Sequence, residues 1–400
     1  MTYYVLIAFC VIILLAYIFD ITAKYTRVPG VILLIATGMF INYLASSFHI
    51  GIPDMSGLLP IMGTLGLILI VLEGSLDLAI RRDKSRLIIG SVSSAILLFA
   101  VMVGVFTYVA VHFLQYDLRA SLLNIIPFAI ISSAVAIPSA AGLTPENREF
   151  VTYESSISDI IGILAFDFIL LSSGSLGTGV LRFIAELILT FIVSVLLSGG
   201  LAILLHKISH HVKYVIIMTV IILVYALAKL VHLPSLLVVL IFGLVMNNNV
   251  LFKNAFSAKW INFDEFNTDL GAFKNIVFEL TFIIRCFFFI LFGFYTRLSD
   301  LLNPSNLMIA AAITVSIFIF RALFFRIVLR LPLNPLLYFA PRGLITILLF
   351  FSIPSILLLP FINVGIVTQV IFLTILMMTF GNMIFSRDRT DQAPETQLRR

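Results

Sequence analysis

The sequence predicts an all-α polytopic membrane protein of about thirteen transmembrane helices. Three observations carry this prediction: 61% of the 400 residues are hydrophobic, only 11% are charged, and apolar runs long enough to cross a bilayer recur along the chain. Soluble domains average about 45–50% apolar and about 25% charged residues, so little of this chain is left for a soluble domain. We therefore expect the lipid bilayer, and no nucleic acid, as a partner despite the net charge of +5.

The expected helices are the apolar runs of about 20 residues, the length needed to cross a bilayer. No positive residue precedes the first run, which favours a transmembrane helix over a cleaved signal peptide. Cys10 and Cys286 both fall in such runs, so we expect neither a disulfide framework nor a metal site. The hydrophilic stretch from Lys253 to Lys274 is expected to be an interfacial cytoplasmic loop. In chain order the expected spans are 3–19, 28–47, 57–78, 87–114, 121–143, 150–172, 180–205, 212–231, 233–252, 275–295, 306–330, 334–358 and 362–385.

Basic residues are distributed unequally between the two ends of these helices. Eighteen of the 25 Lys and Arg residues fall in the odd-numbered loops and the C-terminal tail, and four fall on the opposite side. Short cytoplasmic loops collect Lys and Arg. The pattern therefore predicts a multi-pass protein with its N-terminus outside and its C-terminus in the cytoplasm. The membrane expected is the cell membrane, which is the inner membrane in a cell that has two.

Two segments of the chain match each other without a gap. They read A-K-Y-T-R-V-P-G-V-I-L-L-I-A-T-G-M-F-I-N and A-K-L-V-H-L-P-S-L-L-V-V-L-I-F-G-L-V-M-N. The five identities at the offset of 205 pair Ala23, Lys24, Pro29, Gly38 and Asn42 with Ala228, Lys229, Pro234, Gly243 and Asn247. None of them is Leu, so chance apolar similarity explains them poorly.

This offset predicts an internal repeat, in which each helix of the first half has its equivalent seven helices later in the chain. Because successive helices cross the membrane in alternating directions, the two halves enter it in opposite directions. We expect a first six-helix repeat at 1–179, a linker helix at 180–207, an inverted second repeat at 208–386 and a short cytoplasmic tail at 387–400. Inverted repeats are typical of secondary transporters that work by alternating access, with the substrate site near the bilayer midplane.

The stretch E-S-S-I-S-D, residues 154–159, places two carboxylates inside an expected span. An ionised residue at mid-membrane costs roughly 2.5–3.5 kcal/mol on insertion scales, so each is a candidate functional residue. Asp159 lies near the bilayer centre, and Glu154 lies about 140° around the helix from it. The acid without a permanent partner would exchange protons near neutral pH, although both could also belong to structural ion pairs.

Two expected helices contain residues that interrupt helical structure. The segment I-S-S-A-V-A-I-P-S-A-A-G, 131–142, contains Pro138, which removes a backbone donor and clashes with the preceding turn. The segment Y-F-A-P-R-G-L-I, 338–345, places Pro341, Arg342 and Gly343 in mid-span. Interrupted spans in corresponding positions of two repeats indicate a transport site, since unwound carbonyls and half-helix ends coordinate ions. A kinked helix packed in the bundle is the structural alternative.

These motifs together resemble those of the monovalent cation:proton antiporter superfamily, closest to its sodium/proton exchanger branch. That branch shows E-S-x-x-N-D on one helix, an apolar run ending in F-E-G-G-L, and a lone arginine in the helix before an R-G motif. The matching residues here are Glu154, Ser155, Ser158 and Asp159; Glu73 in V-L-E-G-S-L; Arg321; and Arg342 with Gly343. The resemblance covers essentially the whole chain in the same order.

The resemblance implies a dimerisation domain, a core domain with two crossed unwound helices, and a homodimer. Asp159 would alternately bind the transported monovalent metal cation or a proton, and no cofactor is implied. Glu154 would be salt-bridged to Arg321 as a structural ion pair. Oxygen ligands near the ion would come from Ser132, Ser133, Ser155 and Ser158, with Glu73 and Arg342 in supporting positions.

Two departures from the family pattern leave the choice of cation open. Ser158 stands where the branch has Asn, and it is shorter and lacks the two amide donors. Ser132, Ser133 and Ala134 stand where the branch has T-D-P, which removes a carboxylate. The ion could therefore be Na⁺, K⁺ or Li⁺.

The predicted function is secondary active exchange of a monovalent cation for protons, electroneutral at one to one, in pH homeostasis. A channel or an organic-anion symporter on the same inverted repeat is the main alternative. A membrane enzyme is disfavoured because it would need clustered His, Asp or Ser side chains at one membrane face.

Asp167 could line an access funnel or cap its helix, and Arg285 has only Glu279 as a loose partner along the sequence.

Overall fold

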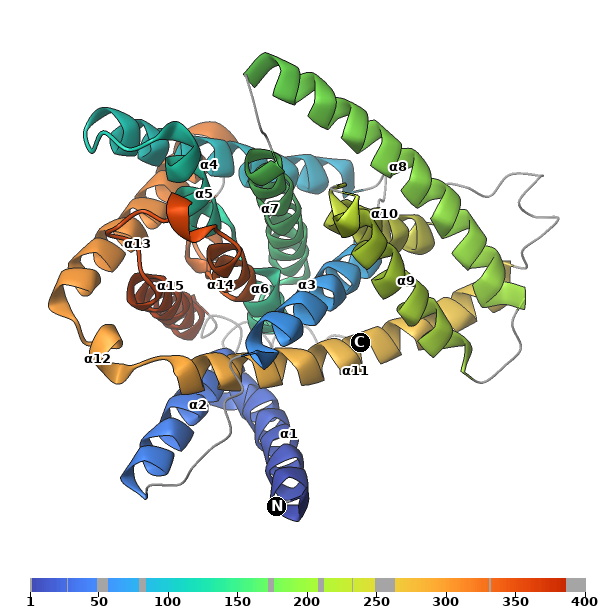
Figure 1. Ribbon diagram of the computed structural model, residues 1–400, viewed down its shortest axis with the longest axis horizontal. Helices are drawn as coiled ribbons and strands as arrows, with labels where there is room; N and C mark the ends of the chain where they lie inside the picture. The colour runs from blue at the N-terminus through green and yellow to red at the C-terminus, as the bar shows by residue number, and fades with distance from the viewer. Residues whose placement is uncertain are drawn as a thin grey trace, which may run out of the picture. The chain divides into compact units, whose positions relative to one another are not determined.

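The computed structural model describes the chain as helices joined by short connections (Figure 1). The described residues are 2–26, 28–48, 57–78, 84–171, 176–207, 212–231, 233–248, 263–330 and 332–385, and no strand occurs among them. Eight of the described helices are long and apolar enough to cross a membrane, and two shorter apolar helices accompany them. The prediction of an all-α, multi-pass membrane protein is confirmed. The count of thirteen spans stays a prediction, and the tail at 387–400 lies outside the described residues.

Contacts divide the chain into two compact units. Unit 1 comprises Met1–Leu59, Arg86–Ser158 and Cys286–Arg400, and unit 2 comprises Pro60–Ser85 and Asp159–Arg285. Two helices, α7 (Pro145–Leu171) and α11 (Phe263–Tyr295), contribute residues to both units. The units therefore do not follow the order of the chain, and each draws residues from both predicted repeats.

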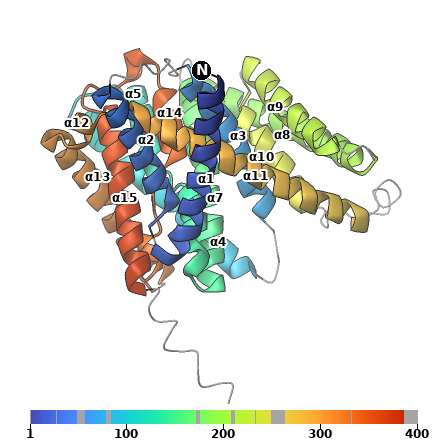
Figure 2. The same cartoon turned by 90° about the horizontal axis from the view of Figure 1, so that it is seen from below.

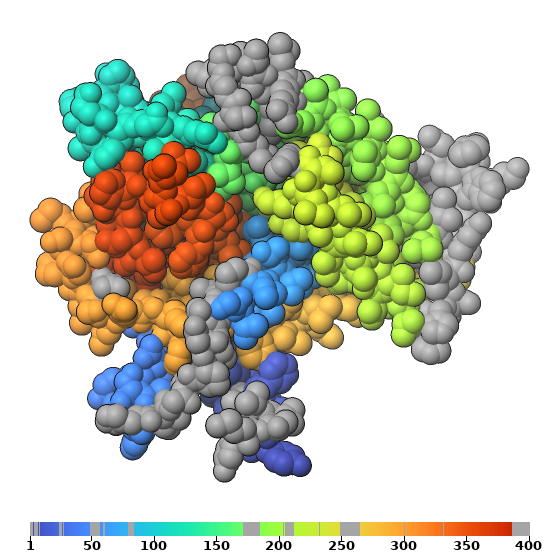
Figure 3. Space-filling model, in the orientation of Figure 1, coloured from blue at the N-terminus to red at the C-terminus, as the bar shows by residue number. Residues whose placement is uncertain are grey.

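Unit 1 contains two pairs of closely packed helices and two short ones that position the site. Helices α1 (Thr2–Thr26) and α2 (Gly30–Ser47) lie side by side, as do α13 (Pro304–Phe324) and α15 (Val364–Phe385) (Figure 2). Helix α5 (Leu118–Ala129) packs against α14 (Leu344–Phe351). In the space-filling view of Figure 3, teal atoms lie directly against red atoms of the C-terminal part of the chain. The other members are α4 (Ser85–His112), α6 (Ser133–Ser139), α12 (Leu298–Leu301) and a π-helical turn at Phe325–Leu329.

Unit 2 is centred on α10 (Ser235–Asn247), which packs against both α8 (Leu176–Lys207) and α9 (Lys213–Leu230). Helix α3 (Leu58–Asp77) lies mostly in this unit. The buried stripe of α8 is made of small hydroxyl residues at every fourth position, Thr190, Ser194 and Ser198. Each hydroxyl donates to the carbonyl four residues earlier. Small side chains with internally satisfied hydroxyls let a neighbouring helix approach closely in a membrane.

Helix α11 begins earlier than its apolar run, at Phe263. Its first turns bury Phe266, Leu270 and Phe273 at intervals of three or four residues, which is an amphipathic helical face. Asp269 in this part pairs with Lys213 of α9 at 2.6 Å. The expectation of a loop from 253 to 274 is therefore wrong for 263–274, and 253–262 lies outside the described residues. The charged residues of 263–274 favour a loop, whereas the spacing of its buried apolar residues is that of a helix.

The two glycines matched by the internal offset make matching contacts. A Cβ on Gly38 of α2 would overlap the Ile290 carbonyl of α11, and a Cβ on Gly243 of α10 would overlap the Ser75 side chain of α3. The second helix of each predicted repeat thus lies against the third helix of the other. Reciprocal contacts of this kind are what a two-fold repeat requires. The repeat itself stays a prediction.

Candidate functional site

The first interruption lies between α5 and α6. Helix α5 ends at Ala129, Ile130 and Ser132 have extended backbone, and α6 starts at Ser133. The predicted interruption is present, but Pro138 does not cause it. Pro138 lies inside α6, one residue before the helix ends and a 3₁₀ turn follows, so little helical hydrogen bonding is lost there.

The second interruption lies before α14, and it contacts the first. Residues 339–343 are not helical and separate a 3₁₀ turn at Leu336–Tyr338 from α14. The backbone N–H of Ser132 donates to the carbonyl of Pro341 at 2.9 Å. The unwound segments therefore satisfy one another's backbone groups. Several half-helix ends meet in this part of unit 1.

Arg342 lies in the second interruption and reaches the end of α5. Its Nε donates to the carbonyl of Phe128 at 2.7 Å, and its Nη1 donates to the carbonyl of Ala340 at 3.0 Å. The last four carbonyls of a helix have no partner inside the helix, and they carry partial negative charge. The buried guanidinium compensates one of them, the carbonyl of Phe128. Arg342 thus joins the second unwound segment to the end of α5.

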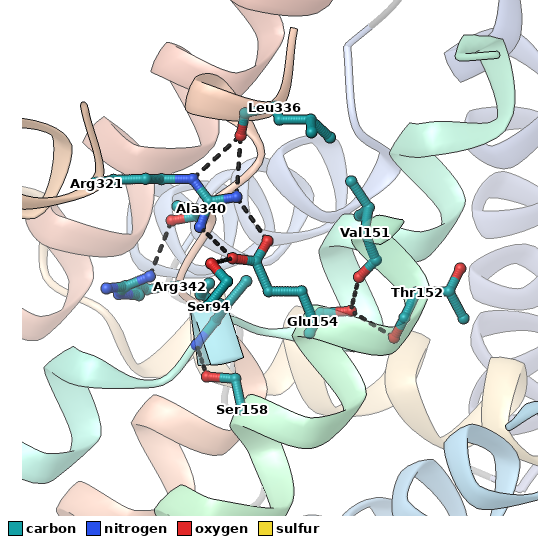
Figure 4. A network of polar contacts seen from close by, with 11 residues as sticks. Ser94, Val151, Thr152, Glu154, Ser158, Arg321, Leu336, Ala340 and Arg342 are labelled. Atoms are coloured by element: carbon teal, nitrogen blue, oxygen red, sulfur yellow. Dashed lines mark hydrogen bonds and ion pairs between the residues drawn. The ribbon is translucent and has the colours of Figure 1, made fainter. Parts of the chain in front are cut away.

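Glu154 of α7 and Arg321 of α13 form a bidentate ion pair (Figure 4). Arg321 Nη1 donates to Oε1 at 2.7 Å, and Nη2 donates to Oε2 at 2.6 Å. Both side chains are 1% exposed. Paired charges with this geometry avoid much of the cost of burying each ion alone.

Neighbouring groups form further hydrogen bonds with the carboxylate and the guanidinium of this ion pair. The Ser94 hydroxyl of α4 donates to Glu154 Oε1. Arg321 Nε and Nη2 also donate to the carbonyl of Leu336, at 3.1 and 2.9 Å. The guanidinium carbon lies 4.5 Å from the centre of the Phe325 ring. Three further elements, α4, the 3₁₀ turn and the π-helical turn, therefore hold the pair. Neither Ser94 nor Leu336 carries any signal in the sequence that would identify it as a partner.

The serines expected near the ion have different surroundings. The Ser158 hydroxyl accepts from the backbone N–H of Ile131 at 2.9 Å, so it supports the first interruption (Figure 4). The Ser155 hydroxyl donates to the carbonyl of Val151 within α7 at 2.7 Å. The Ser132 hydroxyl is buried and makes no hydrogen bond to any described residue. Ser133 is also buried.

Asp159 and Glu73 belong to unit 2. Asp159 is on α7 and 4% exposed, five residues after Glu154 and about 140° around the same helix. Glu73 is on α3, and Arg285 of α11 attracts it electrostatically. Sequence reasoning missed this neighbour of Arg285, because nothing but opposite charge links the two positions. Among the described residues, no three His, Cys, Asp or Glu side chains gather into a polydentate metal site.

Comparisons with known proteins agree on one family and one fold. Residues 10–386 match the family described as the transmembrane sodium/hydrogen exchanger. The fold is similar to that of the sodium proton antiporter MjNhaP1 from Methanocaldococcus jannaschii at pH 8, with a TM-score of 0.70, 20% identity, and coverage of 95% of this chain and 98% of that one. An electron-microscopy structure of the same antiporter gives a TM-score of 0.67 at 17% identity and covers 98% and 97% of the two chains. No curated protein matches the chain by sequence.

Proposed function

Because the chain belongs to the sodium/hydrogen exchanger family, we propose that it exchanges a monovalent cation for protons by alternating access, with Na⁺ as the first candidate ion and K⁺ or Li⁺ as the alternatives. The match over residues 10–386 carries the proposal. Members of this family are transporters and not enzymes, so the chain's work is sodium and proton transport across a membrane. Its physiological role would be pH homeostasis.

Asp159 is the proposed carboxylate that binds cation and proton in turn. It is buried in the middle of α7, where a bare charge is costly to hold or to move through a dry barrier. Reorientation is therefore possible only when the charge is neutralised by either ligand. This single condition makes the exchange obligatory.

Glu154 is a poor candidate for the same work. Both of its oxygens accept from Arg321, and one also accepts from Ser94. A transported cation would have to displace a buried guanidinium, and that would leave Arg321 unpaired. We propose that Glu154 and Arg321 are structural and that they fix α7 to α13. Arg342 and Glu73 have supporting roles.

Oxygen ligands for the cation are proposed from serines, following the family pattern. The Ser132 hydroxyl is buried and makes no hydrogen bond to a described residue, so its oxygen remains free to coordinate. Ser158 accepts one hydrogen bond, and a hydroxyl oxygen has a second lone pair. Ser133 and Ser155 complete the proposed set. With one titrating carboxylate, one cation exchanged for one proton moves no net charge.

The proposed arrangement places the N-terminus outside the cell, the C-terminus in the cytoplasm and two copies in a homodimer. The distribution of basic residues supports the orientation. A channel or an organic-anion symporter on the same fold is the second candidate. A channel would conduct without proton coupling, and a symporter would need a co-substrate.

The test uses the purified chain in liposomes with a pH gradient that a dye reports. Added Na⁺, K⁺ or Li⁺ should dissipate the gradient in the parent, independently of membrane potential. Asp159→Asn should abolish the response. Asp117→Asn is the matched control, because Asp117 is an exposed N-cap of α5 and Asn also caps helices well. Exchange at the parental rate in Asp159→Asn would refute the assignment, and a potential-dependent response would refute electroneutral exchange.

A further inference from the structure

Asp167 of α7 forms a loose ion pair with Lys229 at the end of α9. The Lys229 Nζ lies 3.8 Å from Asp167 Oδ1. The Asp167 side chain is only 10% exposed, whereas the Lys229 side chain is 55% exposed. The carboxylate has lost most of its water, and the cation beside it has kept most of its own.

The opposite end of α9 carries a pair of another kind. Lys213 Nζ lies 2.6 Å from Asp269 Oδ1, and these side chains are 14% and 16% exposed. That contact is a short charge-assisted hydrogen bond between two partly buried groups. At 3.8 Å the Asp167 contact is too long for a hydrogen bond, and ion pairs with one solvated partner are weak. Lys229 therefore neutralises Asp167 poorly.

The surroundings of Asp167 suit an incoming cation. Asp167 follows Asp159 by eight residues, about 12 Å along the same helix. Tyr225 lies one turn before Lys229, is buried, and is near both members of the pair. The side chain of Ser235, the first residue of α10, is also close to Tyr225. A carboxylate and hydroxyl oxygens are the ligands that hard cations prefer.

We propose that Asp167 recruits the transported cation at the membrane face where α7 ends, and that the arriving cation displaces Lys229 from it. The lysine can leave because its ammonium is already largely hydrated and its stem is flexible. The inference rests on the proposed function, because it adds a step before binding at Asp159. With the proposed orientation this face is the outer one.

The two members of the pair should have opposite effects on cation affinity. Asp167→Asn removes the attraction and should raise KM for Na⁺ at this face by about threefold or more, without changing the maximum rate. Lys229→Gln removes the competing charge and should lower that KM by a similar factor. Both effects should persist at an ionic strength of about 0.1 M, because salt screens charges beyond about 10 Å and the Asp167 side chain is only 10% exposed. A purely structural pair would give both variants the same sign.

The experiment measures Na⁺-driven exchange by the full chain in right-side-out and everted vesicles, so that each face is titrated separately. Asp269→Asn and Lys213→Gln, at the other end of α9, are the matched controls and should leave the outer KM unchanged. Opposite shifts in KM confined to one face support the inference. Shifts of the same sign, equal shifts at both faces, or no shift with exchange intact overturn it and leave the proposed function standing. A parent chain that exchanges no cation overturns both.

Discussion

Replacing Arg321 by Met should cost the folded protein about 3–5 kcal/mol, the usual effect of removing one partner of a buried ion pair. Arg321 makes four hydrogen bonds, two to Glu154 and two to the carbonyl of Leu336. In the variant the Glu154 carboxylate keeps only the Ser94 donor, at a position where 1% of the side chain is exposed. Methionine fills much of the space, so the loss is chiefly electrostatic.

This loss can be converted into a melting temperature. Unfolding entropy is about 2.1 cal/mol/K per residue, so over 400 residues the variant should melt about 4–6 °C below the parent. The assay heats detergent-solubilised protein and measures the fraction that still elutes as a single species on size exclusion. The control is Glu154→Leu combined with Arg321→Met, which buries no unpaired charge and should recover most of the loss.

The double variant also separates structure from transport. If the pair only joins α7 to α13, the double variant should still exchange cations for protons. A single Arg321→Met variant as stable as the parent would refute the structural role. A stable double variant without exchange would show instead that Glu154 takes part in ion transport.

Two further predictions concern the unwound segments. In Gly343→Ala the new Cβ would lie 2.6 Å from the Ser132 hydroxyl, so we expect a loss of about 1–3 kcal/mol that Ser132→Gly partly restores in a thermal melt. A Gly343→Ala variant that melts with the parent would contradict this close approach. Ser158→Ala leaves the buried N–H of Ile131 without its acceptor, so hydrogen exchange at Ile131 should accelerate and stability should fall by about 1–3 kcal/mol. Unchanged exchange at Ile131 would mean that another acceptor serves this group.

The family, the helical fold and the approximate helix positions could be predicted from the sequence. Apolar length is a local property, so α7, found at Pro145–Leu171, was expected at 150–172. The start of α11 at Phe263 is not predictable in this way, because the acidic residues of its first turns favour a loop. Asp269 is tolerated in that helix because Lys213 pairs with it, and a contact across 56 residues has no local signal.

The candidate site was predictable in its residues and much less in their contacts. The motifs identify Glu154 and Arg321, which form an ion pair although they are 167 residues apart in the sequence. The exact place of the first interruption was not predictable from Pro138. It depends on partners for the freed backbone groups, and these come from Ser158 and Pro341. The roles proposed for Asp159 and the serines stay predictions.

The contact between α2 and α11 has a consequence for how the protein is made. Asn42 of α2 donates to the carbonyl of Phe294, 252 residues later in the chain. At about 5–20 residues per second, a ribosome needs roughly 13–50 s to cover that distance. During this interval α1 and α2 are in the bilayer while the surface that later covers Gly38 does not yet exist. Until α11 is made, the contacts between α1 and α2 are the ones available to hold this early helical hairpin together.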